Sequence, residues 1–142
     1  MWPFRKKFEP DYDALRSEAQ RRIAAERDAL TAQLAKTETK LNGMEDALGR
    51  MSERLNQGQL SAAAIAARHG GFSQVVYRSL ERAQELCAPP TFTERYASDC
   101  PTGEQREREA VRETAEAGEY ARNEHRILAD KARRLREELR DL

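Results

Sequence analysis

The sequence predicts an all-α fold, arranged as a long antiparallel helical hairpin or coiled coil with a small helical head inserted between the two long helices. Charged residues make up 35% of the 142 residues and apolar residues 39%, a balance typical of long solvated helices rather than of a compact globule. The chain has few helix breakers, with 7 Gly and 5 Pro. Apolar side chains recur in alternating steps of three and four along two segments, which predicts amphipathic helices with partners.

The first long helix is expected over residues 11–57, after a short tail at residues 1–10. It begins near Asp11 or Asp13, because a carboxylate can accept hydrogen bonds from the free N–H groups at a helix start. It ends near Asn56, since the following Gly58 can adopt the left-handed conformation that terminates helices.

An apolar seam follows this helix in steps of four and three. Its members are Leu30, Leu34, Thr37, Leu41, Met44, Leu48, Met51 and Leu55. Upstream, Leu15, Ala19 and Ile23 recur eleven residues later as Glu26, Leu30 and Leu34, a spacing that keeps the helix straighter than a heptad does. Such a seam requires a partner helix.

The insert, residues 58–100, reads as two short helices and a loop. Ser61 is expected to cap a helix over 62–69, Gly70 and Gly71 to break it, and Ser73 to cap a second helix that runs to about Leu86. In this structural interpretation the two glycines form a corner, and the apolar residues form the core of a small head, with Phe92 and Tyr96 covering it from the loop. The expected core residues are Ile65, Phe72, Val75, Val76, Leu80 and Leu86.

The second long helix is expected over residues 101–142, and Thr102 with Gln105 matches a capping box at its start. Its predicted seam comprises Val111, Thr114, Gly118, Ala121, His125, Leu128, Ala132, Leu135, Leu139 and Leu142.

Pairing of the two seams predicts how the long helices meet. An antiparallel hairpin would place Leu139 and Leu142 near Leu15 and Ala19. A parallel dimer through the first helix alone is the alternative arrangement. A single hairpin leaves much of each seam open, and oligomers would close it, as in a four-helix bundle.

Residues 64–80 also resemble a DNA-binding helix-turn-helix motif. A small residue at Ala66, a glycine at Gly70 and a buried Val76 stand at the separations that such motifs show. The resemblance implies a second helix whose exposed face contacts DNA, because Gln pairs with adenine, Arg with guanine and Tyr with phosphate. The implied contact residues are Ser73, Gln74, Tyr77 and Arg78.

Other features depart from that motif. His69 and Gly71 stand where helix-turn-helix motifs bury apolar residues. The insert carries four Arg and four acidic residues, and the whole chain is balanced at 25 basic and 25 acidic residues. Phosphate contacts supply most of the affinity for nucleic acid, so nucleic acid is the less favoured partner.

The sequence indicates no catalytic, metal or cofactor site, so we do not expect an enzyme. Cys87 and Cys100 lack zinc-type spacing; a disulfide between them is one interpretation, and free thiols in a reducing cytosol are the other. His125 falls on the predicted seam and His69 at a helix end, where neither has a second ligand at metal-binding spacing.

The tail, residues 1–10, combines aromatic and basic side chains. Trp2, Phe4 and Phe8 stand beside Arg5, Lys6 and Lys7. The pattern is typical of a weak membrane-interface anchor, of a peptide that docks on a protein, or of a frayed terminus.

Together these features predict a non-catalytic, elongated and oligomeric interaction or assembly protein that presents its head and tail to protein partners. The alternatives are a DNA-binding regulator dimerised by the long helices, and a peripheral membrane scaffold anchored by residues 1–8. We expect a cytoplasmic protein or a component of an assembled particle, without signal peptide or transmembrane segment. The expected partner-binding residues are Trp2, Phe4, Phe72, Tyr77, Arg78 and Tyr96.

Overall fold

A computed structural model of the chain describes residues 11–88 and 103–142, and the regular elements in these two ranges are all α-helices. The prediction of an all-α fold is confirmed for them. No helix among them is long and apolar enough to cross a membrane. The helices are α1 (Tyr12–Asn56), α2 (Leu60–His69), α3 (Gln74–Cys87) and α5 (Gly103–Asp141).

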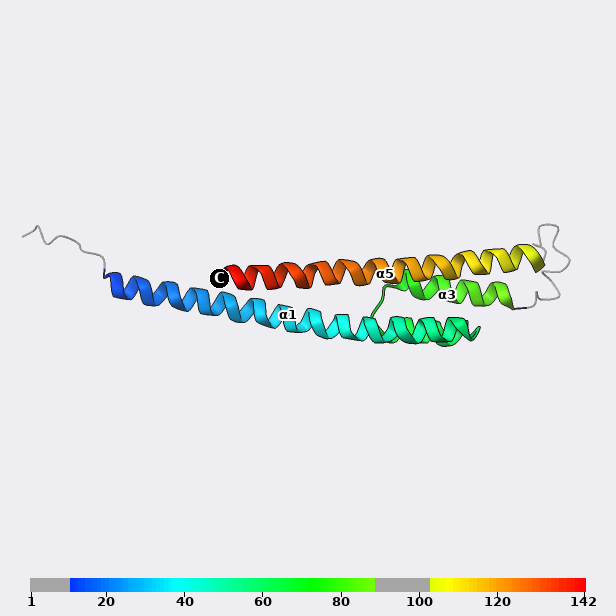
Figure 1. The fold of residues 1–142 in the computed structure, drawn as a ribbon, viewed down its shortest axis with the longest axis horizontal. Helices are drawn as coiled ribbons and strands as arrows, with labels where there is room; N and C mark the ends of the chain where they lie inside the picture. The colour runs from blue at the N-terminus through cyan, green and yellow to red at the C-terminus, as the bar shows by residue number, and fades with distance from the viewer. Residues whose placement is uncertain (1–10, 89–102) are drawn as a thin grey trace, which may run out of the picture.

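The helices pack in chain order. α1 contacts α2, α2 contacts α3, α3 contacts α5, and α5 closes the ring against α1. The two long helices lie side by side and run in opposite directions, α2 turns back along the end of α1, and α3 lies along α5 (Figure 1). The predicted head is therefore not confirmed as a separate unit, because α2 and α3 pack along the long helices and share a core with them.

Two contacts between side chains fix the register of α1 against α5. Arg136 Nη2 lies 2.8 Å from Glu38 Oε1, and His125 Nε2 lies 3.2 Å from Glu45 Oε1. Leu142 follows Arg136 by six residues, so α5 ends opposite the part of α1 just before Leu34.

That register corrects the prediction for the C-terminus. Leu139 and Leu142 do not lie near Leu15 and Ala19, because α5 stops before it reaches them. α1 extends past α5 at one end of the molecule, and α5 extends past α1 at the other (Figure 1). The offset arises because the N-terminal part of α5 packs on α3, beyond the end of α1.

The seam of α1 is covered only in its second half. Residues 11–29 are all exposed, and burial begins with the half-buried Leu30 and Leu34. Leu48 and Leu55 are half-buried, and the fully buried positions are Thr37, Leu41, Met44, Ala47 and Met51. The predicted seam is therefore buried where α5 and α2 contact α1.

The seam of α5 differs from the prediction near its start. Val111 is 66% exposed, whereas Ala110 and Ala117 are buried. The prediction assumed that this stretch faces α1, but here α5 packs against α3, which turns a different face inward. Further along, Ala121, Ala132 and Leu135 are buried as expected.

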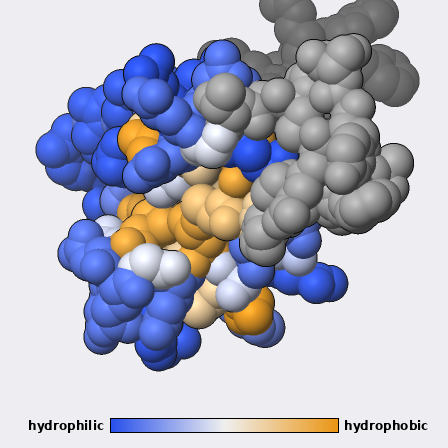
Figure 2. All heavy atoms as spheres, turned by 90° about the vertical axis from the view of Figure 1, so that its right-hand side faces the viewer, coloured by the Kyte–Doolittle hydropathy of each residue, from blue (hydrophilic) through white to orange (hydrophobic). Residues whose placement is uncertain are grey.

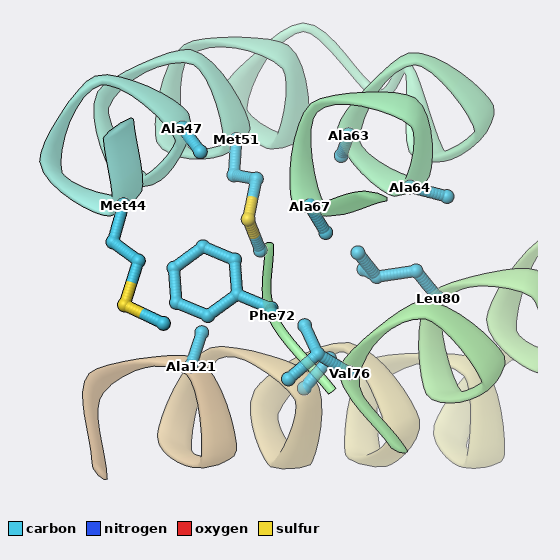
Figure 3. Close-up of a cluster of buried hydrophobic side chains, with 11 residues drawn as sticks. Met44, Ala47, Met51, Ala63, Ala64, Ala67, Phe72, Val76, Leu80 and Ala121 are labelled. Carbon is cyan, nitrogen blue, oxygen red and sulfur yellow. The ribbon is translucent and has the colours of Figure 1, made fainter. Parts of the chain in front are cut away.

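The main core lies between the α1–α2 pair and the α3–α5 pair. Phe72 projects from the α2–α3 connection into the space between Met44 and Met51 of α1 and Ala121 of α5 (Figure 3). Leu80 of α3 packs in the same core. In the end view, apolar residues gather between the helices and hydrophilic residues cover the outside (Figure 2).

Alanine lines the inner face of α2. Ala63, Ala64 and Ala67 are buried there, and their small side chains let neighbouring helices approach closely. Ile65 and Val75, both expected in the core, are instead 55% and 50% exposed. Their neighbours in sequence, Ala64 and Val76, are buried on the inner faces of α2 and α3, so the side chains of Ile65 and Val75 point outward.

The helix ends agree in part with the predictions. Asp11 caps α1, and its Oδ1 accepts hydrogen bonds from the N–H groups of Asp13 and Ala14. Ser61 does not cap α2, because the helix begins at Leu60, and Gln59 is its N-cap residue. Ser73 is the N-cap residue of α3, but its side chain makes no capping hydrogen bond.

Candidate interaction surfaces

α5 binds both ends of α3. At the start of α3, the backbone N–H of Ser73 donates to the two carboxylate oxygens of Glu124 at 3.2 and 3.1 Å. At its end, the Arg106 guanidinium donates to the carbonyl oxygens of Glu85, Leu86 and Ala88 at 3.1–3.3 Å. Both charges interact favourably with the dipole of α3, because an anion is stabilising at a helix N-terminus and a cation at a C-terminus.

Loss of the Glu124 carboxylate is expected to destabilise the fold. Glu124→Ala leaves the Ser73 N–H without its acceptor and should lower the free energy of unfolding by about 0.5–2 kcal/mol, as for other lost N-caps. Glu119→Ala, at an exposed position of the same helix, is the matched control and should change it by less than about 0.5 kcal/mol. Urea denaturation measures both, and equal effects would contradict the capping role.

Tyr77 connects the outer surfaces of α2 and α3. Its ring lies 5.9 Å from the guanidinium carbon of Arg68, within range of a cation–π contact. A hydrogen bond to Glu81 and the negative charge of that carboxylate raise the pKa of Tyr77 above its ordinary value of 10.0. The phenol is therefore a hydrogen-bond donor to the Glu81 carboxylate.

The candidate DNA-contacting residues are engaged within the protein. Arg78 Nη2 donates to Gln74 Oε1 at 3.1 Å. The Glu124 carboxylate occupies the N-terminus of α3 through Ser73, where a helix would otherwise favour a phosphate. An acidic group at that point repels the DNA backbone, so the electrostatics weigh against DNA recognition by this helix.

The arrangement of α2 and α3 also differs from a helix-turn-helix. In that motif the two helices cross at about 90–120°. Here α2 and α3 run in nearly opposite directions, one along α1 and the other along α5 (Figure 1). Gly71, with a φ of 73°, provides the turn between them, which agrees with the structural interpretation of the glycine pair as a corner.

A groove of about 620 Å³ runs along the outer side of the α1–α2 pair. Small residues line much of it, namely Gly43, Ala47, Ala62, Ala66 and Gly70, and its charged lining residues are of both signs: Asp46, Arg50, Glu53 and Arg54. The small residues allow the two helices to approach closely, so the groove follows from their packing.

The N-terminal part of α1 presents apolar side chains without cover. Tyr12 is 71% exposed, Leu15 52% and Ile23 42%. Together with Ala19 they continue the seam that α5 covers further along, and we call these four residues the uncovered seam. Surface apolar residues aligned on one helix face are typical of a contact with another helix.

Several predicted site residues lie elsewhere than expected. Phe72 is only 9% exposed, so its ring belongs to the core, as the structural interpretation of the insert predicted, rather than to a docking surface. Trp2, Phe4, Tyr96 and Cys100 lie outside the described residues. Cys87 is an exposed free thiol at the end of α3.

Sequence reasoning missed Glu124 and Arg106 as partners of α3. Neither residue belongs to the predicted seam, and Glu124 lies 51 residues from Ser73 along the chain. The only sequence signal for these contacts is that one helix carries both an acid and a base, and charge-rich helices commonly show such residues without any partner.

Within the described residues, no group of three or more His, Cys, Asp and Glu side chains could hold a metal ion. No protein-family model matches the chain. Comparisons with curated proteins and with solved structures also give no match.

Proposed function

We propose that the chain is a non-catalytic, elongated interaction or assembly protein that self-associates and presents its helical insert and N-terminal tail to protein partners. The single observation that carries the proposal is that residues 11–29 are all exposed, although α1 continues from them without a break into its buried second half. Their apolar residues continue a seam that is buried or half-buried where other helices cover it. Helices in proteins gain most of their stability from packing such a face.

The insert adds a second type of surface. Arg68 and Arg78 are exposed on α2 and α3, and the half-buried ring of Tyr77 lies beside Arg68. Tyr and Arg are favoured anchors at protein interfaces. The tail, with Trp2 and Phe4, supplies further aromatic residues next to the uncovered seam in sequence. These features support a role in binding proteins rather than in transforming a small molecule.

Disruption of the uncovered seam is expected to abolish self-association. Leu15→Glu combined with Ile23→Glu places two carboxylates on the apolar face, and both positions are exposed, so the core is left intact. Ile127→Glu, at an exposed position of α5, is the matched control. Light scattering should give the mass of one chain for the double variant and a larger mass for the control, with unchanged helix content by circular dichroism.

A further inference from the structure

The apolar face of α1 continues beyond the end of α5. Successive helical residues turn by about 100°, so the uncovered seam falls on the same side of α1 as the buried Leu41, Met44 and Met51. Cover by α5 ends just before Leu34, as the contact between Arg136 and Glu38 shows. The apolar face that α1 presents to α5 in their interface therefore continues into a stretch that has no partner helix in the described part of the chain.

We infer that the uncovered seam binds the same seam of a second copy of this chain in antiparallel orientation, with the two Ala19 residues facing each other across a two-fold axis. The inference rests on the proposed function, since it requires a chain that self-associates. It adds the partner, the binding face and the direction of pairing.

The space beyond the end of α5 suits a second α1. α5 runs antiparallel to α1 (Figure 1), so an antiparallel α1 from a second copy has the direction of α5 and continues its line along the same face. The part of each copy in which α1, α2, α3 and α5 pack together then lies at the opposite end of the paired α1 segments from that of the other copy. A parallel pair would instead bring both bundles side by side, where each α5 already occupies the face that the other α1 needs.

The side chains match in size in the antiparallel register. With Ala19 at the axis, Leu15 lies opposite Ile23 of the second copy, four residues away on each side. Tyr12 lies opposite Glu26, seven residues away on each side, which pairs a phenol with a carboxylate. Small residues meet at the centre and large ones on either side, as knobs-into-holes packing requires.

The charges beside the seam favour the same direction. In the single chain Arg22 Nη2 lies 2.7 Å from Glu18 Oε1, and both side chains are largely exposed. In the antiparallel pair each of these residues approaches the oppositely charged one of the second copy, and the two-fold axis repeats the pair. A parallel in-register pair would set Glu26 against Glu26 within the seam, and like charges in such positions are destabilising.

Cysteine cross-linking tests the pairing directly. The full chain carries Cys87→Ser and Cys100→Ser, and Ala19→Cys is then oxidised under mild conditions. We expect a cross-linked dimer, because facing positions across a helix pair meet the Cα separation of a disulfide. Leu15→Cys and Ile23→Cys should each stay uncrosslinked alone and cross-link when the two variants are mixed under reducing conditions before oxidation. Ala115→Cys, an exposed alanine on α5, reports random collisions.

The other outcomes overturn the inference in distinguishable ways. Equal cross-linking of all three seam variants, each alone, would show a parallel pair. A dimeric mass by light scattering without cross-linking at Ala19 would place the interface elsewhere and leave the proposed function standing. The mass of a single chain for the wild type at every concentration would overturn both proposals.

Discussion

Replacement of Leu80 by alanine is expected to lower the free energy of unfolding by about 2–5 kcal/mol. Leu80 is fully buried between α3 and the neighbouring helices, and its removal leaves a cavity in a core that alanine-rich helices cannot readily refill. In Figure 3 its side chain points toward the inner face of α2. Thermal and urea denaturation of the variant measure the loss.

Val75→Ala is the matched control on the same helix. Val75 is half exposed, and alanine has the higher helix propensity, so the free energy of unfolding should change by less than about 0.5 kcal/mol. A comparable loss for the two variants would mean that Val75 also belongs to the core, as the sequence alone predicted.

Replacement of Gly70 by alanine is expected to destabilise the protein by about 1–3 kcal/mol, the usual effect of overpacking. A Cβ at Gly70 would overlap Ala47 Cβ of α1 and lie 3.1 Å from Cε2 of Phe72. Its φ is −74°, which alanine adopts without strain, so the effect reports space alone. Denaturation in urea gives the change.

Gly49→Ala provides the opposite expectation. Gly49 lies inside α1 with open space around an added Cβ, and alanine in a helix interior is favoured over glycine by about 0.8–1.0 kcal/mol. The variant should therefore be more stable than the wild type. A stabilising Gly70→Ala would show that α1 and α2 are not in close contact at the corner.

Local signals in the sequence were sufficient for α1. The Asp11 cap, the end at Asn56 and the buried positions Leu41, Met44 and Met51 were all predicted, because cap chemistry and apolar periodicity depend on nearby residues. The same seam pattern also identified Leu15, Ala19 and Ile23, although their lack of cover became visible only with the position at which α5 ends.

The path of the insert could not be predicted in the same way. Residues 62–67 are almost all alanine, so periodicity does not distinguish the inner from the outer face of α2, and Ile65 was placed inside because it is the largest apolar residue there. The return of α3 along α5 depends on Glu124 and Arg106, which are distant in sequence from the backbone groups they bind. Contacts of that kind leave no local pattern.

Among the residues expected to contact partners, Arg78 is exposed, Tyr77 is half-buried against the main core, and Phe72 is buried in it, as the alternative expectation of a core position required. An aromatic residue beside a glycine corner is compatible with either position. Its burial follows from the close approach of α1 and α2 at Gly70, which brings Met44 and Met51 to the ring.

Self-association of the full chain is tested most directly by sedimentation equilibrium of the wild type over a wide concentration range. The apparent mass is expected to rise toward twice the 16.2 kDa of one chain, because mass action fills the uncovered seam. A mass of 16.2 kDa at every concentration would contradict an assembly protein that pairs through α1.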